Sequence, residues 1–376
     1  MSSKINWEGR GICITGARGT GKSTLMLQYI KENLNRNEAL YLSLDDLYFK
    51  QYSLVDVADK FIQHGGKYLF LDEVHKYEDW QTSVKNLYDF NPDLHIIASG
   101  SSILALQKSV ADLSRRMVYY ELTELSLREF IALKYRIEVP IFALEEILSN
   151  HQNIVAEIKT KLPHPLALFQ EYLRLGAYPF FLEGEKDYLI KINQLINIII
   201  DYDLPYGKDI SVSTQSKLKK LLFIISTSVP FTPNISKLAE KTETTRLQLL
   251  EMLHLLESSR LIRNLRSATG GISMMNKPEK ILFNNTNLMH SLAHEAIGKG
   301  NLRETFIVSQ LQNAGNMVTY PKNGDFLVNG KYLMEVGGKQ KSKKQIYSDT
   351  DAYILADDLV YGYENKIPIY LMGFLY

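Results

Sequence analysis

The sequence predicts an α/β fold in which a parallel sheet is covered by helices, followed by helical and mixed segments. Three observations support this prediction. Short apolar runs rich in β-branched residues alternate with helical periodicity over the first 120 or so residues. From Leu125 the pattern changes to helix after helix. From about Gly300 it returns to a mixture of helix and strand.

The amino-terminal elements are expected in regular alternation. Helical spacing of apolar residues is found at 23–34, 54–63 and 80–88. Strand-like runs lie at 11–15, 39–44, 67–71, 94–99 and 117–122. Parallel strands require crossover connections, which these helices supply. We therefore expect residues 1–124 to form one layered α/β domain.

The rest of the chain is expected to form three further domains. A helical region at 125–212 begins with a capping box, Ser126 followed by Glu129. Residues 213–295 contain a helix at 235–241, a turn at 242–245 and a long amphipathic helix to Ser259. Strands at 261–267 and 280–284 follow, which is the plan of a winged helix. Residues 296–376 hold a helix at 302–314 and strands at 317–320, 325–328, 332–336, 352–355 and 367–373.

Composition excludes several classes of protein. Lys and Arg number 43 against 42 Asp and Glu, a net charge of +1, so the chain is not a polycation that coats nucleic acid by charge alone. A single cysteine, Cys13, excludes an intramolecular disulfide framework and multi-cysteine metal sites. The amino end lacks the apolar stretch of a signal peptide, and no apolar run approaches the ~20 residues that a bilayer requires. We expect a cytoplasmic protein without membrane contact.

A glycine-rich loop follows the first expected strand. The pattern G-x-x-x-x-G-K-[ST] is matched throughout by Gly16-Ala17-Arg18-Gly19-Thr20-Gly21-Lys22-Ser23. Its glycines let backbone N–H groups face phosphate oxygens, and the next helix offers its positive end. Lys22 can reach the β- and γ-phosphates, and the Ser23 hydroxyl can bind Mg²⁺. The alternative is a glycine turn without ligand. We expect nucleotide at Gly16, Ala17, Arg18, Gly19, Thr20, Gly21, Lys22, Ser23 and Thr24.

A second acidic element supports a nucleotide site. The apolar run 68–71 ends in Asp72 and Glu73. At this position Asp72 is expected to hold Mg²⁺ and Glu73 to polarise the attacking water. An adjacent catalytic Glu and an intervening strand favour the AAA/RecA-like branch of P-loop NTPases over small GTPases. The guanine-reading string Asn-Lys-x-Asp is absent from the sequence, so ATP is the expected nucleotide.

Two further residues are candidates for catalysis. Ser101 follows the fourth expected strand, where a polar side chain can sense the γ-phosphate, with Ser99 and Ser102 as neighbours of the same type. A helix cap is the equally reasonable alternative. Arg116, beside Arg115, can reach phosphate within the chain or from a neighbouring subunit. The alternative is a solvated charge pair.

These motifs together resemble a known family, the prokaryotic AAA-like P-loop ATPases whose members carry a C-terminal domain related to PD-(D/E)XK nucleases. The resemblance covers essentially the whole chain. It implies ATP binding with Mg²⁺, a winged-helix segment and a restriction-endonuclease-like end, and it indicates no biological process. It rests on the loop at 16–23, Leu71-Asp72-Glu73 with Trp80, Ser99-Gly100-Ser101-Ser102, Arg116, Glu121-Leu122, Leu125-Ser126-Leu127-Arg128-Glu129-Phe130 and Tyr172-Leu173-Arg174-Leu175-Gly176-Ala177-Tyr178-Pro179.

A nuclease site of that kind needs two acids and a lysine on adjacent strands. Glu304, Asp325 and Glu335 are the candidate ligands of this second metal site. The expected Glu-x-Lys is broken after Glu335, and Lys339 substitutes only if the strand continues through the intervening glycines. A three-residue turn at 329–331 places Asp325 opposite Glu335, whereas a two-residue turn separates them. The alternative is an inactive nuclease fold.

Two basic segments are candidates for contact with nucleic acid. Arg246 and Gln248 begin the second winged-helix helix, where a major-groove reader carries polar residues, but the helix is so apolar that packing within the protein is favoured. A basic run contains Lys339, Lys341, Lys343 and Lys344. It is either a solvated loop or a contact to DNA phosphates.

The leading functional hypothesis is an ATP-hydrolysing molecular switch that repositions the other domains. One alternative is an ATP-gated, metal-dependent DNA nuclease or DNA-binding protein. Another is a platform that binds ATP and a protein partner without turnover. The oligomeric state is left open by the sequence.

Overall fold

The chain forms two compact units in the computed structural model, which describes residues 4–100, 113–207, 210–227, 233–267, 277–292, 297–341 and 351–376. Unit 1 comprises Met1–Thr123 and Ile198–Ile210, and unit 2 comprises Glu124–Asn197 and Ser211–Tyr376. The sequence predicts that the segment at 198–210 belongs to the helical region, whereas in the structure it groups with the amino-terminal unit. The boundaries at 212 and 295 within unit 2 stay predictions.

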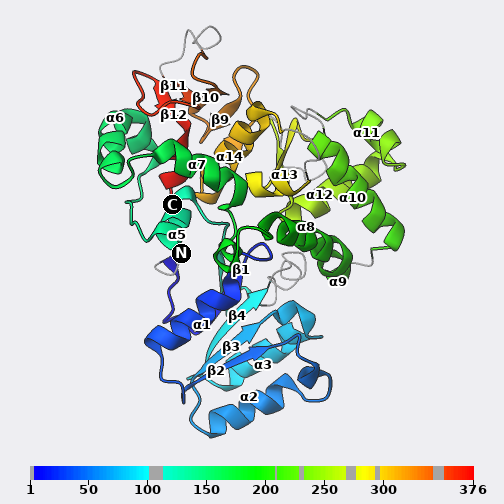
Figure 1. Ribbon diagram of the computed structural model, residues 1–376. Helices are drawn as coiled ribbons and strands as arrows, with labels where there is room; N and C mark the ends of the chain where they lie inside the picture. The colour runs from blue at the N-terminus through cyan, green and yellow to red at the C-terminus, as the bar shows by residue number, and fades with distance from the viewer. Residues whose placement is uncertain are drawn as a thin grey trace. The chain divides into compact units, whose positions relative to one another are not determined.

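Unit 1 is built on a five-stranded parallel sheet (Figure 1). Its order is β2-β3-β4-β1-β5, so β1 lies between β4 and β5. The strands are β1 (Gly11–Thr15), β2 (Ala39–Ser43), β3 (Tyr68–Asp72), β4 (His95–Gly100) and β5 (Val118–Glu121). All five predicted strands form. The central strands β1, β3 and β4 are mostly buried apolar runs, whereas the edge strands β2 and β5 are partly exposed.

Helices cover both faces of this sheet. The helices are α1 (Lys22–Asn33), α2 (Leu54–Gln63) and α3 (Trp80–Phe90), with short 3₁₀ turns η2 (Leu47–Lys50) and η3 (Val74–Lys76). Ile12 and Ile14 pack with Met26 of α1 on one face, and Cys13 packs on the opposite face with residues of α2 and α3. This alternation along β1 is the two-residue period of a strand. Because all five strands run parallel, their carboxyl ends meet at one edge of the sheet.

Unit 2 is largely helical. Its helices are α5 (Leu127–Tyr135), α6 (Leu144–Lys161), α7 (Pro165–Leu175), α8 (Tyr188–Ile198), α10 (Val212–Thr227), α11 (Ile235–Lys241), α12 (Arg246–Ser258), α13 (Thr286–Leu292) and α14 (Lys299–Asn313), with a 3₁₀ turn η4 (Pro179–Glu183). The predicted capping box forms, since Ser126 and Glu129 exchange side-chain and backbone hydrogen bonds. Helix α13 was not predicted from the sequence. None of the described helices combines the length and apolarity needed to cross a membrane.

Helices α11 and α12 precede an antiparallel pair, β6 (Ile262–Leu265) and β7 (Lys280–Phe283). The apolar residues of α12 are mostly buried, whereas Arg246 and Gln248 at its start are exposed. Arg263 of β6 is buried, and its guanidinium donates to Asn284 O, Gln312 Oε1 and Asn313 Oδ1. The order of these helices and strands is the one predicted for a winged helix. The assignment of this segment as a winged-helix domain stays a prediction.

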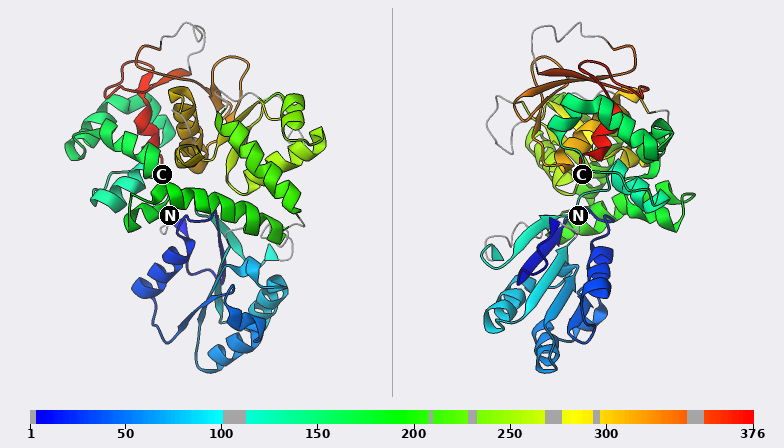
Figure 2. Two further views of the ribbon diagram at one scale, coloured as in Figure 1. Left: turned by 45° about the vertical axis from the view of Figure 1, so that its right-hand side comes forward. Right: turned by 90° about the vertical axis from the view of Figure 1, so that its left-hand side faces the viewer.

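The carboxyl-terminal sheet has the order β12-β11-β10-β9-β8. Its strands are β8 (Val318–Thr319), β9 (Phe326–Val328), β10 (Tyr332–Gly337), β11 (Ala352–Ala356) and β12 (Lys366–Pro368). Helix α14 packs against the sheet, as Figure 2 shows in gold below brown and red strands. The strand expected at 367–373 is wrong beyond Pro368, because the chain turns into the 3₁₀ helix η6 (Ile369–Phe374) after this proline.

Candidate nucleotide site

The phosphate loop connects β1 to α1 at the carboxyl edge of the sheet. Gly16, Gly19 and Gly21 all have positive φ angles, of 149°, 83° and 95°. At Gly16 a side chain is excluded for a second reason, since an added Cβ would lie 2.2 Å from Leu122 O. Thr20 Oγ1 donates to Ala17 O at 3.0 Å, which closes the turn from within. These residues form the curled backbone that the sequence pattern predicts.

Lys22 is folded into this loop. Its ammonium donates to Gly16 O at 3.2 Å and to Ala17 O at 2.8 Å, and the residue is 5% exposed. Burial lowers the pKa of Lys22 to about 8, although Glu73 and Asp72 oppose the shift. The loop therefore holds a cation whose charge is poorly solvated, an arrangement that an anionic ligand stabilises.

Asp72 ends β3 and is held from three sides. Tyr41 Oη, on the neighbouring strand β2, donates to its Oδ2 at 2.5 Å. Ser99 Oγ of β4 and the Glu73 amide donate to Oδ1. The Ser23 side chain lies close to the same tyrosine hydroxyl, so the two residues predicted to bind Mg²⁺ share one neighbour.

This donor set fits Mg²⁺. A serine hydroxyl and a carboxylate are hard oxygen ligands of the type that the ion prefers. Tyr41 was missed by the sequence analysis, because the pairing of β2 with β3 that brings it to Asp72 is a tertiary contact. Burial and the Asp72 carboxylate raise the pKa of Tyr41, so its hydroxyl stays a donor.

Glu73 has a strained backbone. Its φ angle is 52°, in the left-handed region that non-glycine residues seldom adopt, and it begins the 3₁₀ turn η3. The side chain is half-buried and lies 3.5 Å from His75 Nδ1. Burial lowers the pKa of His75 to about 4, so this imidazole is neutral at ordinary pH. The turn places the Glu73 carboxylate next to the loop cations.

Arg18 is held by a residue far along the chain. Its Nε and Nη2 donate to the two carboxylate oxygens of Asp203 at 2.7 and 2.9 Å, across 185 residues. Lys76 Nζ lies 3.5 Å from the same carboxylate. Asp203 ends a π-helical turn, η5 (Ile199–Asp203), which is followed by α9 (Leu204–Gly207). Sequence patterns give no signal for such a pairing.

Two residues predicted to be catalytic, Ser101 and Arg116, are not found among the residues that surround the phosphate loop. Ser101 lies outside the described residues, and within them the polar side chain of this strand that contacts Asp72 is Ser99. Arg116 lies at the amino edge of the sheet, where its carbonyl contacts Gly11. Its guanidinium binds both oxygens of Asp89 at 2.7 Å. Five residues of β1 separate this edge from the loop, about 16 Å, so Arg116 does not reach the phosphate loop of its own unit.

The carboxyl-terminal acids adopt the register that a metal site requires. Tyr332 pairs with Val328 and Met334 with Phe326, so continuation of the ladder places Asp325 opposite Glu335. However, Lys341 pairs with Glu335 at 2.7 Å, and Lys280 pairs with Glu304 at 2.7 Å. Among the described residues, which include all three acids, no group of three His, Cys, Asp or Glu is suited to a metal ion.

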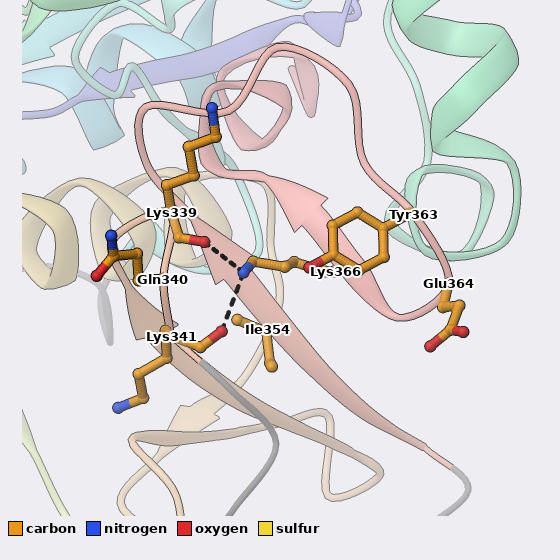
Figure 3. Close-up of a pocket in the computed structure, with 7 residues that line it drawn as sticks. All are labelled: Lys339, Gln340, Lys341, Ile354, Tyr363, Glu364 and Lys366. Atoms are coloured by element: carbon orange, nitrogen blue, oxygen red, sulfur yellow. Dashed lines mark hydrogen bonds between the residues drawn. The ribbon is translucent and has the colours of Figure 1, made fainter.

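Lysines therefore pair with two of the three acids predicted to bind a second metal, and that site stays a prediction. The residue that reaches Glu335 is Lys341 rather than Lys339, since β10 ends at Gly337. Beside this cluster lies a cavity of about 420 Å³ (Figure 3). Lys366, one of the residues that line it, donates from its ammonium to Lys339 O at 2.6 Å and to Lys341 O at 3.0 Å. These two hydrogen bonds hold the backbone of residues 339–341, which follow β10, against β12.

The parallel sheet, the curled glycine loop and the acidic end of β3 define a P-loop nucleotide-binding domain. Residues 8–131 match the family described as "AAA domain". This part of the chain is therefore similar to AAA-type P-loop ATPase domains.

Relatives of the whole chain carry little functional information. "Uncharacterized protein MJ1637" of Methanocaldococcus jannaschii is 27% identical over 95% of this chain and 81% of its own. Among solved structures, "The walker-type atpase paby2304 of pyrococcus abyssi" is 12% identical, with a TM-score of 0.44 over 77% of this chain and 93% of its own. A "dna polymerase iii, gamma subunit-related protein" of Thermotoga maritima is 14% identical, with a TM-score of 0.26 over 68% and 95%.

Proposed function

We propose that the protein binds Mg·ATP and hydrolyses it, and that turnover drives a conformational switch. The observation that carries this proposal is the buried Lys22 ammonium inside the glycine loop, next to the clamped Asp72 carboxylate. A buried cation without a fixed anionic partner is unfavourable, and a triphosphate supplies that partner.

Each residue of the site has a role in this proposal. Backbone amides of the loop at 16–24 face the phosphates, and Lys22 binds the β- and γ-phosphates. Ser23 and Asp72 hold Mg²⁺, which when bound neutralises phosphate charge. Glu73 orients and polarises the attacking water, which places a negative group beside the γ-phosphate. Ser99 and Tyr41 keep Asp72 in position.

Lys22→Ala tests the binding site. We expect the variant to lose Mg·ATP binding in calorimetry while keeping the wild-type circular dichroism and melting temperature. The matched control is Lys31→Ala, which removes a lysine from the last turn of the same helix. Unchanged ATP affinity in Lys22→Ala would refute the site.

Glu73→Gln tests hydrolysis separately from binding. We expect ATP affinity to persist while turnover falls about 10²–10⁴-fold, the usual contribution of a positioned general base. If wild-type protein binds ATP without turning it over, and Glu73→Gln changes nothing, the non-catalytic platform replaces the switch. Turnover with and without DNA of several forms then separates a nucleic-acid partner from a protein partner.

A metal-dependent DNA nuclease is the second candidate function. It is favoured by one observation, the register that sets Asp325 opposite Glu335 beside Lys341. The acids as arranged do not fit a metal ion, so we derive no reaction step from them. Incubation with plasmid, ATP and Mg²⁺ or Mn²⁺ is the test. Cleavage that is lost in Asp325→Ala supports the candidate, and cleavage that persists excludes these ligands.

A further inference from the structure

The contact between Arg18 and Asp203 joins the phosphate loop to a connecting segment, defined here as residues 198–207, that lies far away in the sequence. Asp203 is 4% exposed and binds the guanidinium through both of its oxygens. Arg18 lies in the loop, two residues after Gly16. The pair therefore links the nucleotide site to a segment outside the nucleotide motifs.

The chemistry of this pair resembles that of a nucleotide complex. The guanidinium fork that binds a carboxylate through two hydrogen bonds binds a phosphate in the same way. A γ-phosphate held by the loop would thus compete with Asp203 for Arg18. Arg18 lies four residues before Lys22 in the same phosphate loop, so both cations belong to one site.

The connecting segment is suited to respond to such an exchange. Its first turn is π-helical, η5 (Ile199–Asp203), and π-helical turns are rare and concentrated at functional sites. Asp203 is partly neutralised by Lys76 as well as by Arg18. Losing Arg18 would leave a buried carboxylate with one cation at 3.5 Å, which favours movement of the segment toward water. The segment continues directly from α8 of unit 2.

We infer that Arg18 binds the γ-phosphate of ATP and that Asp203 is the positioning residue that holds Arg18 when no γ-phosphate is present. Binding of ATP, but not of ADP, transfers the guanidinium from Asp203 to phosphate and releases the connecting segment. This inference rests on the proposed function, and it assigns to Arg18 the part of an arginine finger supplied within the chain.

The affinities for ADP and for a non-hydrolysable ATP analogue provide the first test. We expect Arg18→Ala to lower the preference for the triphosphate over ADP by about tenfold, within the usual range of coupling between sites. We expect Asp203→Asn, which keeps the shape and removes the charge, to raise this preference several-fold. The double variant should show the preference of Arg18→Ala alone, because Asp203 acts through Arg18.

Hydrogen exchange of the backbone amides in the connecting segment provides the second test. In the wild type we expect faster exchange with the ATP analogue than with ADP or without nucleotide. Arg18→Ala should lose this difference, and Asp203→Asn should exchange fast in all three states. Glu257→Gln is the control, because it breaks a comparable ion pair, with Arg266 at 2.9 Å, in unit 2. It should behave as the wild type.

Three outcomes overturn the inference. They are an unchanged preference for triphosphate in Arg18→Ala, additive effects in the double variant, and exchange in the connecting segment that does not depend on the γ-phosphate. If the wild type binds and hydrolyses ATP while any of these results holds, the inference fails and the proposed function stands. If the wild type binds no ATP, both fail together.

Discussion

Tyr41→Phe removes one oxygen atom and isolates the contribution of the hydrogen bond to Asp72. The distance from Tyr41 Oη to Asp72 Oδ2 is 2.5 Å, in the range of hydroxyl bonds to a charged carboxylate. Such bonds contribute about 1.5–3 kcal/mol. Asp72 is 3% exposed, so water replaces the lost donor poorly. Because Ser99 and the Glu73 amide still hold Oδ1, we take the lower value, about 1.5 kcal/mol.

This free energy corresponds to about a tenfold change in an equilibrium constant. The assay is ATP turnover measured against free Mg²⁺ at saturating ATP. We expect the Mg²⁺ concentration for half-maximal turnover to rise about tenfold in Tyr41→Phe, as is typical when a residue that orients a metal ligand is removed. The rate at saturating Mg²⁺ should stay close to that of the wild type.

Tyr119→Phe is the matched control. Tyr119 lies on β5 of the same sheet, and within the described part of the chain its buried Oη has no hydrogen-bond partner. Removing this hydroxyl should leave the Mg²⁺ dependence unchanged. If Tyr41→Phe has the same Mg²⁺ dependence as the wild type and Tyr119→Phe, Tyr41 does not position Asp72 for the metal.

Three further changes test other parts of the structure. Burial lowers the pKa of His75 from 6.5 to about 4, so the unfolded chain binds this proton first and stability falls by up to about 3 kcal/mol as the pH drops from 6.5 to 4. His75→Gln should flatten this dependence in urea titrations at several pH values, and an unchanged slope would contradict it. Asn287 is fully buried and accepts from Ala177 N and Tyr188 Oη, so Asn287→Ala should cost about 2–4 kcal/mol by the same assay. A loss below about 1 kcal/mol would show that the network repacks. Gly16→Ala should abolish ATP binding in calorimetry, because its Cβ would meet Leu122 O at 2.2 Å, whereas wild-type affinity would mean that the loop tolerates the shift.

Much of unit 1 was predictable because its signals are local. The loop pattern, the apolar runs and the helical spacing each occupy a short stretch of chain, and the strands form where they were expected. The acids at the end of β3 followed from the same local pattern. Arg116 was predicted wrongly from the same kind of signal, because a residue that directly precedes a parallel strand lies at the amino edge of the sheet, away from the loop.

The carboxyl-terminal acids show a different limit. The sequence posed the choice between two registers, and the three-residue turn at 329–331 decided it in favour of Asp325 opposite Glu335. Yet Lys280 and Lys341, which neutralise Glu304 and Glu335, come from a separate strand and a loop. The positions of these two lysines beside the acids depend on tertiary packing, which no local sequence pattern encodes.

The sequence by itself determined that a glycine-rich loop, a helix and an acidic strand end follow one another in a parallel α/β domain. It could do so because these features depend on backbone conformation and on contacts between neighbouring residues. Tertiary structure alone decided that Tyr41 clamps Asp72 and that Asp203 holds Arg18, across 31 and 185 residues. Such pairs form only when distant elements pack together, and the energy that selects them comes from burial of the whole core rather than from either residue.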